Sequence, residues 1–376
     1  MDLRSNRRLG IIVATTLVAT AILASCSMKD WPSFLGLMEH DHSDQAQSAP
    51  AKSIWPTITE HYQLPAIKTP LVGQQATLYA SGVNHFQTVL ANATPYLYFI
   101  VQELKQRQMP VELAFLPIIE SSYSPRTPTG LNPAGLWGLM PVAAKHLNLV
   151  RDEFKDERRD IVRSTHAALD LLQELHKQFG DWNLALAAYN WGPGNVSRAL
   201  GSNARRKLSN TYDNLSMPIE TQVFVPKLFA IRDIIARPEA YKITLPDIPD
   251  APYFETVPVP QTIDMKVAAE LADMSTQDFI NLNPAFNKPV IVGSATQTIL
   301  LPVDQAKKYR ANLNLRKEPL SEFTSVVLET SETPEALAKT WQVDAARVRQ
   351  INNLRWGARL KPGAIVLLPI PSGQRP

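Results

Sequence analysis

The sequence predicts an α-dominated α+β protein in which a helical domain is followed by two small βααβ units. Apolar residues recur at helical spacing from about 75 to 237, and little of this stretch alternates with the period of a strand. Five prolines between 246 and 260 then indicate a stiff linker. Beyond the linker, a strand–helix–helix–strand pattern occurs twice as a degenerate internal repeat. A chain of 376 residues is also too long for one ordinary core, which favours two or three domains.

The first 25 residues have the features of a secretory leader. Arg4, Arg7 and Arg8 precede the apolar run 11–24, and small residues follow it. The run is too short for a comfortable membrane span. We therefore expect this segment to be a signal peptide.

Cys26 follows the leader directly and is the only cysteine, so no disulfide can form within the chain. The residues LASC at this junction resemble a bacterial lipobox, whose cysteine is lipidated and becomes the mature N-terminus. The resemblance implies a lipoprotein signal peptide over 1–25 and a membrane anchor through the lipid on Cys26. Ser27, in place of an aspartate, implies the periplasmic face of the outer membrane by the usual sorting pattern.

Residues 26–74 are expected to be the lipidated N-terminus and a tether. The stretch 39–53 is polar and has too few aliphatic residues to offset the entropy of ordering. His40 and His42 lie in this stretch and are typical of a solvated segment, and none of the seven histidines forms an HExxH pattern. We expect no metal and no cofactor.

The formal charge of +3 comes mostly from the leader arginines. Without the leader, the remaining balance is too small to steer the chain toward polyanions. A nucleic-acid partner is therefore not expected.

The helical domain is expected over 75–240. A helix is predicted over 96–108, and another over 110–121 with Pro110 in its first turn and Pro117 in its interior, where it would kink the helix. A longer helix is predicted up to Gly180, with Ser164 as its cap.

A short apolar helix is expected next, over 181–191, and a Gly-Pro-Gly break ends it.

The two C-terminal units are expected over 254–304 and 322–370. In the first, Ser275 or Thr276 suits the start of the second helix. In the second, Thr333–Pro334–Glu335 suits the start of one helix and Asp344 the start of the next.

Three motifs in the helical domain resemble those of the family 1 lytic transglycosylases. They are ESSYSP at 120–125, NPAGLWGLMPVAAKHL at 132–147 and ALAAYNWGPGNV at 185–196. The membrane-bound lytic murein transglycosylase D group is the nearest in pattern, and the resemblance covers roughly 75–312. It implies a lysozyme-like catalytic fold that cleaves peptidoglycan between N-acetylmuramic acid and N-acetylglucosamine. The C-terminal units resemble LysM modules, which implies peptidoglycan glycan strands as the partner.

The resemblance implies roles for individual residues. Glu120 matches the catalytic acid/base, and Ser121 matches a neighbouring serine that helps to bind the saccharide. Tyr189 and Asn190 match a tyrosine–asparagine pair in the cleft. Gly138 departs from the family, which usually has a glutamine there, so a substrate-facing amide is missing.

Other interpretations of these residues remain open. Ser121 could simply end a helix, and Tyr189 could be a core aromatic with its hydroxyl at the edge. Trp137 and Met140 could stack on a sugar face, although packing is the ordinary role of a methionine.

The residues around Glu120 suggest its chemistry independently of any family. Leu116 and Pro117 would lie one helical turn before it and exclude water, which favours the neutral carboxyl group. A carboxyl group that is neutral near pH 7 can protonate a glycosidic oxygen, as the buried general acid of lysozyme does.

Standard glycosidases need a second carboxylate, yet no acidic residue lies between Glu120 and Asp152. A single-acid mechanism is therefore the simpler hypothesis. In it, the muramyl 6-hydroxyl attacks its own anomeric carbon and leaves a 1,6-anhydro end. A hydrolytic muramidase on the same fold and a non-catalytic peptidoglycan-binding lipoprotein are the alternatives.

Overall fold

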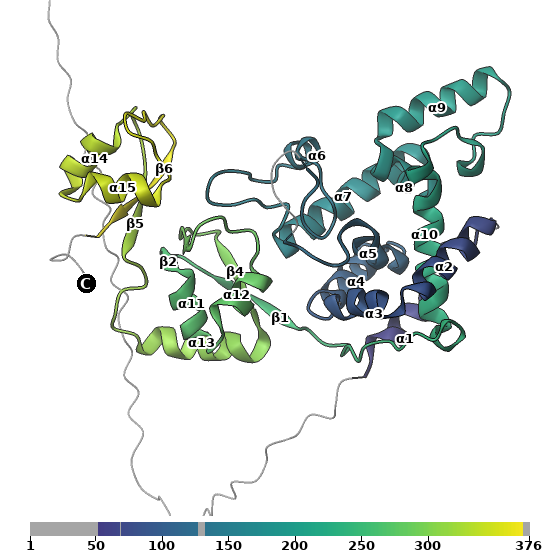
Figure 1. Ribbon diagram of the computed structural model, residues 1–376, viewed down its shortest axis with the longest axis horizontal. Helices are drawn as coiled ribbons and strands as arrows, with labels where there is room; N and C mark the ends of the chain where they lie inside the picture. The colour runs from purple at the N-terminus through teal and green to yellow at the C-terminus, as the bar shows by residue number, and fades with distance from the viewer. Residues whose placement is uncertain (1–51, 68, 127–131, 371–376) are drawn as a thin grey trace, which may run out of the picture. The chain divides into compact units, whose positions relative to one another are not determined.

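The structure is a computed structural model that describes residues 52–67, 69–126 and 132–370 (Figure 1). The expected leader, Cys26 and most of the polar stretch that follows them lie outside the described residues. No described helix is both long enough and apolar enough to cross a membrane.

Helices and short 3₁₀ turns make up the described chain as far as residue 241, which confirms the α-dominated first part (Figure 1). They are α1 (Ile54–Thr59), α2 (Pro70–Ser81), α3 (Val83–Asn92), α4 (Leu97–Gln106), η1 (Val111–Phe115), α5 (Leu116–Ser121), α6 (Pro141–His146), α7 (Ile161–Phe179), α8 (Trp182–Trp191), α9 (Pro193–Arg205), η2 (Tyr212–Asn214), α10 (Ile219–Ala236) and η3 (Pro238–Tyr241).

The prediction of a tether as far as residue 74 is wrong in its second half. Helix α1 buries Ile54, Trp55 and Ile58 in the core of the helical domain. The indole nitrogen of Trp55 donates to the carbonyl oxygen of Pro246 at 2.7 Å. The burial of three apolar side chains favours an ordered helix at this position.

The predicted single helix over 110–121 is also wrong. The chain forms the 3₁₀ helix η1 and then the α-helix α5, and Pro117 lies in the first turn of α5 rather than in a helix interior. A first-turn position needs no amide donor, so proline fits there without a kink. The division gives Glu120 a short helix of its own.

Helices α7 and α8 begin and end at residues with the expected chemistry. The carboxylate of Asp160 accepts the amide of Arg163 at 3.0 Å, so Asp160 caps α7. Ser164, the predicted cap, is buried inside the helix. The predicted end at Gly180 is confirmed, since its φ of 70° is the left-handed conformation that glycine adopts without strain. Asp181 then caps α8.

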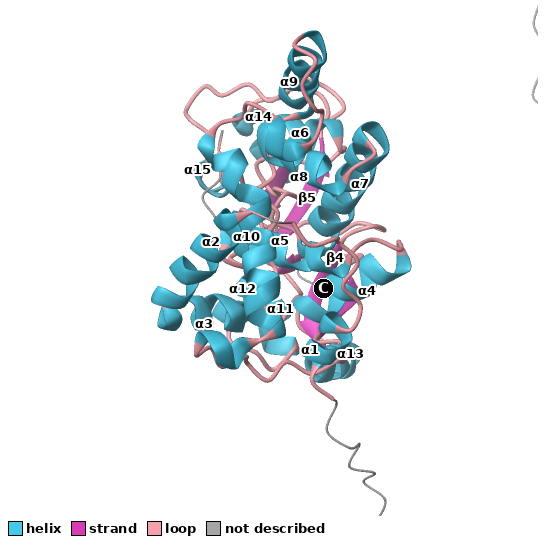
Figure 2. Ribbon diagram, turned by 90° about the vertical axis from the view of Figure 1, so that its right-hand side faces the viewer, coloured by secondary structure: helices cyan, strands magenta, loops and turns pink. Residues whose placement is uncertain are grey.

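The strands belong to the two C-terminal units, where they form two-stranded antiparallel ladders (Figure 2). The first unit contains β1 (Phe254–Pro258), β2 (Ile263–Asp264), α11 (Met265–Leu271), α12 (Thr276–Leu282), β3 (Val290–Ile291) and β4 (Thr298–Pro302), and α13 (Val303–Leu315) follows it. The second contains β5 (Phe323–Val327), α14 (Pro334–Trp341), α15 (Ala345–Ile351) and β6 (Ile365–Pro369).

The strand β1 pairs with β4, and β5 pairs with β6, which confirms the βααβ scheme in both units. Ser275, Thr333 and Asp344 cap the helices predicted for them.

A buried asparagine occupies the same structural position in both units. The amide nitrogen of Asn283 donates to the carbonyl of Leu300 at 2.8 Å, and its oxygen accepts from the Leu300 amide at 2.7 Å. Asn352 does the same to Leu367 at 2.8 and 2.9 Å. Each side chain therefore ties the end of the second helix to the last strand, which confirms the internal repeat.

Candidate active site

Glu120 lies in the last turn of α5, where the chain reverses abruptly. Ser122 and Tyr123 both have φ near 54°, and the amide of Tyr123 donates to the carbonyl of Pro117 at 3.0 Å. The buried Tyr123 hydroxyl donates to the carbonyl of Ala114 at 2.5 Å and fixes this reversal. The helix end that carries Glu120 is therefore rigidly held.

Burial raises the pKa of Glu120 from 4.5 to about 7, and the positive charge of Lys227 on α10 opposes part of that rise. The water-excluding environment is the larger effect, as the apolar residues before Glu120 suggest. A sizeable fraction of Glu120 is therefore protonated near neutral pH, as a general acid requires.

A tight hairpin, Ala134–Leu139, lies against Glu120. Ala134 and Leu139 exchange two main-chain hydrogen bonds of 3.2 and 3.0 Å. Gly135 and Gly138 both have positive φ, at 77° and 59°, so the turn depends on glycine at two positions. We call this segment the 134–139 hairpin.

The main chain at Gly138 is in contact with the acid itself. A Cβ atom built on Gly138 would lie 3.1 Å from Cδ and 3.3 Å from Cβ of Glu120, and would overlap Oε2. From the family pattern, Gly138 was expected to leave the site without a substrate-facing amide. In the structure, the absence of a side chain at Gly138 provides the space that the Glu120 carboxyl group fills.

Ser121 and Tyr189 both donate to carbonyls of the 134–139 hairpin. The Ser121 hydroxyl lies 2.8 Å from the carbonyl oxygen of Leu136 and 3.1 Å from that of Pro117. The Tyr189 hydroxyl donates to the carbonyl of Trp137 at 2.6 Å. Burial, and then the charge of Glu120, raise the pKa of Tyr189 well above its usual value, so it remains a protonated donor.

Of the other predicted cleft residues, one is buried and two are exposed. Trp137 is fully buried and its indole nitrogen donates to the Thr165 hydroxyl at 2.9 Å, so the prediction that it stacks on a sugar is wrong. Met140 is 44% exposed, at the start of α6. Asn190 is exposed at the end of α8, and its oxygen accepts from the Thr221 hydroxyl at 2.8 Å.

Lys227 is a residue that the sequence reasoning missed. It is the only charged residue between Val223 and Ile231, within the otherwise apolar middle of α10. The same signal, one charge in an apolar run, singles out Glu120. Two such residues on helices that pack together are a pattern that can be found in sequence.

Among the described residues, the electrostatics of Glu120 are set by burial and by one cation. The charged group that acts on its pKa is Lys227, whereas a neighbouring carboxylate would raise that pKa by repulsion. No group of three or more metal-binding side chains occurs in the described residues either. The arrangement can donate and accept one proton at Glu120, next to a hairpin whose carbonyls are already bonded.

Comparison with known proteins identifies two regions. The family "Transglycosylase SLT domain" matches residues 97–211. The family "Lytic transglycosylase MltD, LysM-like domain" matches residues 253–317.

Relatives match over longer stretches. Membrane-bound lytic murein transglycosylase D of Escherichia coli is 30% identical over 332 residues, which cover 85% of this chain and 73% of that protein. A putative tributyltin chloride resistance protein of an Alteromonas species is 38% identical over 170 residues, which cover 45% of this chain and 80% of that protein.

Among solved structures, an inactive mutant of the lytic transglycosylase Slt from Pseudomonas aeruginosa is 23% identical over 39% of this chain and 24% of that one. The TM-score of this match is 0.29.

Proposed function

Because the chain belongs to the membrane-bound lytic murein transglycosylase D family, we propose that it cleaves peptidoglycan between N-acetylmuramic acid and N-acetylglucosamine and leaves 1,6-anhydro ends. The observation that carries the proposal is a single carboxyl group, Glu120, whose pKa is raised to about 7 by burial. One acid near neutrality suits a reaction in which the same group first gives a proton and then takes one.

The reaction proceeds in two proton transfers. Protonated Glu120 gives its proton to the glycosidic oxygen as the bond to the anomeric carbon of the muramyl sugar breaks. The carboxylate so formed then accepts the proton of the muramyl 6-hydroxyl, whose oxygen bonds to that carbon. The substrate's acetamido group shelters the cationic intermediate, and no water is consumed.

The residues around Glu120 have separate tasks. Ser121 and Tyr189 fix the 134–139 hairpin through its carbonyls, so we assign them a positioning role alongside any saccharide contact. Asn190 and Met140 are exposed and are proposed to contact the saccharide directly.

A hydrolytic muramidase is the nearest alternative. Such an enzyme needs a second carboxylate to activate water or to attack the sugar. The charged group that acts on the pKa of Glu120 in the described residues is the cation Lys227, which favours the single-acid reaction.

A non-catalytic peptidoglycan-binding lipoprotein is the other alternative. Binding a glycan does not require a proton donor, so such a protein would gain nothing from a carboxyl group with a raised pKa. Burying a carboxyl group is also costly, because its charged form is removed from water. The raised pKa of Glu120 therefore argues for catalysis.

The C-terminal units are proposed to hold the enzyme on glycan strands. In the second unit, Trp356 lies between α15 and β6 and is 80% exposed, and the Arg349 guanidinium lies 4.8 Å from its ring centre. An exposed tryptophan offers an apolar face to a sugar ring. We also propose that lipid on Cys26 anchors the chain to the periplasmic face of the outer membrane.

Digestion of purified sacculi tests the proposed reaction. The product mixture is analysed by mass spectrometry after incubation with the chain that begins at Ser27. Fragments one water lighter than the hydrolysis products are expected. Fragments with free reducing ends would indicate a muramidase, and binding without release would indicate a non-catalytic protein.

A further inference from the structure

Arg158 is fully buried and its charge is matched by Asp156, which is also buried. The Nε and Nη2 atoms of Arg158 donate to the two carboxylate oxygens of Asp156 at 3.0 and 2.8 Å. Burial raises the pKa of Asp156, but the hydrogen bonds and charge of Arg158 outweigh it, so the pKa is lowered overall. Because desolvation offsets most of the attraction in such a pair, stability alone does not explain it.

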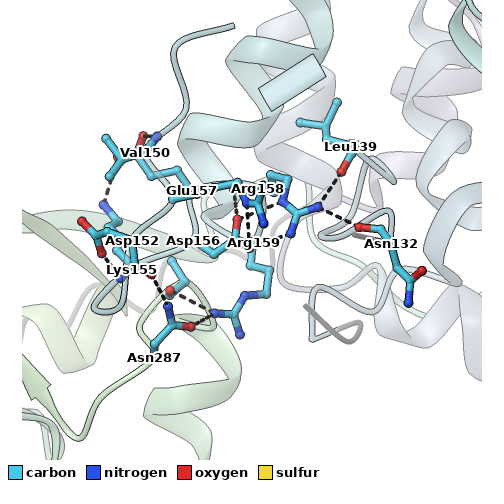
Figure 3. A network of polar contacts seen from close by, with 12 residues as sticks. Asn132, Leu139, Val150, Asp152, Lys155, Asp156, Glu157, Arg158, Arg159 and Asn287 are labelled. Atoms are coloured by element: carbon cyan, nitrogen blue, oxygen red, sulfur yellow. Dashed lines mark hydrogen bonds and ion pairs between the residues drawn. The ribbon is translucent and has the colours of Figure 1, made fainter. Parts of the chain in front are cut away.

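The third nitrogen of the guanidinium, Nη1, bonds to one carbonyl just before the 134–139 hairpin and to one at the end of it. It donates to the carbonyl of Asn132 at 2.8 Å and to that of Leu139 at 3.1 Å (Figure 3). The main chain of Arg158 also lies against Gly135, where a Cβ atom would be 2.7 Å from the Arg158 carbonyl carbon. Arg158 therefore fixes this hairpin with its side chain and its backbone together.

The segment that carries Arg158 is held by hydrogen bonds of its own. The carboxylate of Asp152 accepts the amides of Phe154 and Lys155, both at 2.7 Å (Figure 3). The Glu157 amide donates to the carbonyl of Val150 at 2.9 Å, and the Val150 amide donates to the carboxylate of Glu157 at 2.9 Å. A firm base of this kind lets a guanidinium hold distant carbonyls in place.

Residues of the first C-terminal unit bond to the same segment. The Asp156 amide donates to the carbonyl of Ala285 at 2.9 Å, and the Asn287 amide donates to that of Phe154 at 2.7 Å. Arg159, the next residue along, bonds to Ala285 and Asn287 rather than to the hairpin (Figure 3).

We propose that Arg158 is a positioning residue for Glu120 that acts through the 134–139 hairpin, holding the main chain at Gly138 against the carboxyl group and excluding water from it. The inference rests on the proposed function and adds a residue to it. Arg158 does not touch the reacting atoms. Lysine cannot replace it, because a single nitrogen cannot bind both oxygens of Asp156 and two carbonyls at once.

An infrared titration of Glu120 tests the proposal without relying on activity. The infrared signal of the Glu120 carboxyl group is obtained by subtracting the spectrum of a Glu120→Gln variant. This subtraction is made once for the wild type and once for Arg158→Lys, each with its own Glu120→Gln counterpart. Loosening of the hairpin admits water, so in Arg158→Lys the pKa of Glu120 is expected to fall by about one unit, a tenfold change in ionisation ratio. Lys227 and Tyr189, the charged and titratable groups that act on Glu120, are unchanged in these proteins.

Arg159→Lys is the matched control, and its Glu120 should titrate as in the wild type. On sacculi, the alkaline limb of activity should shift to lower pH in Arg158→Lys, with a larger fall in kcat than rise in KM. If Arg158→Lys merely reduced the amount of folded protein, the activity would fall at every pH and the alkaline limb would stay at the same pH. That outcome would overturn the proposal. An inactive wild type with the expected infrared shift would overturn the proposed function alone.

If Arg158→Lys does not fold, the double variant Asp156→Leu with Arg158→Met replaces the ion pair by apolar groups of similar volume. The same fall in the pKa of Glu120 is expected there. An unchanged pKa, or failure of both variants to fold, would overturn the proposal and leave the pair a purely structural role.

Discussion

At the scale of single residues, the site depends on how little space surrounds Glu120. Its carboxyl group is buried beside the main chain of Gly138. Ser121 of the same helix and Tyr189 of α8 donate to the two hairpin carbonyls that precede Gly138. Burial outweighs the attraction of Lys227, and the pKa is raised to about 7. Small changes in this space should therefore alter catalysis more than folding.

Gly138→Ala should lower kcat at least about tenfold, because the added methyl group displaces the Glu120 carboxyl and a misplaced catalytic group costs roughly that much or more. Gly180→Ala is the matched control. Gly180 also has positive φ, at 70°, but nothing lies within 4 Å of its Cβ position. The control should lose about 1 kcal/mol of stability and keep its kcat. Equal kcat values in the two variants would contradict the role assigned to Gly138.

The pH dependence of activity follows from the same carboxyl group. Glu120 must be protonated to act as an acid, so activity is present below its pKa of about 7 and is lost as the pH rises through that value. Lys227 lowers this pKa, so Lys227→Met should move the alkaline limb of kcat/KM to higher pH, whereas Lys227→Arg should leave it in place. A limb that moves to lower pH in Lys227→Met would refute the assignment.

At the scale of elements, the sequence predicted the order of the helices and strands but not the contacts between them. Helical spacing, the proline cluster and the repeated unit predicted the α-dominated part and both βααβ units, because these signals are local. The cap at Asp160 and the first-turn place of Pro117 were missed, since Ser164 and a continuous helix satisfied the same local rules.

In the candidate site too, the sequence predicted some residues and not their contacts. Glu120 and Tyr189 were predicted, and the structure places both of them in contact with the 134–139 hairpin. Trp137 was misjudged because a tryptophan between glycines gives no sign of which way it faces, and Thr165 is 28 residues away in sequence. Arg158 was missed because two of its partners are main-chain carbonyls, of Asn132 and Leu139, which are 26 and 19 residues away in sequence. A main-chain carbonyl carries no side-chain signal that a sequence pattern could reveal.

In the second C-terminal unit, Trp356→Ala should weaken binding to sacculi several-fold. The wild-type ring offers an exposed face, and about 0.5 to 1.5 kcal/mol of stacking is lost on truncation. Sedimentation with sacculi in a Glu120→Gln background measures binding without digestion. Val327→Ala removes another exposed apolar group, on β5 of the same unit, and should bind normally. Binding that is equal in the two variants would remove Trp356 from the glycan surface.

At the scale of the whole molecule, the helical domain that carries Glu120 precedes two small units built on one plan. The buried Asn283 and Asn352 show that the two units share a structural rule even though their sequences have diverged. The transglycosylase family match falls on the helical domain and the LysM-like match on the first of the two units, as the proposed function requires.

The proposed anchor predicts that the full chain takes up labelled fatty acid when it is made in a bacterium, and that Cys26→Ser takes up none. The labelled protein should fractionate with the outer membrane on a density gradient. Labelling of Cys26→Ser would place the lipid elsewhere, and labelled wild type in the inner-membrane fraction would contradict the sorting role of Ser27.

Digestion of sacculi in water labelled with heavy oxygen separates the proposed reaction from hydrolysis in one step. In the proposed reaction, Glu120 moves one proton in each direction, and the sugar's own hydroxyl, not water, closes the new bond. We therefore predict released fragments with no heavy oxygen, and no release at all by Glu120→Gln that has folded normally. Heavy oxygen at the new reducing end, or release by Glu120→Gln, would contradict this mechanism.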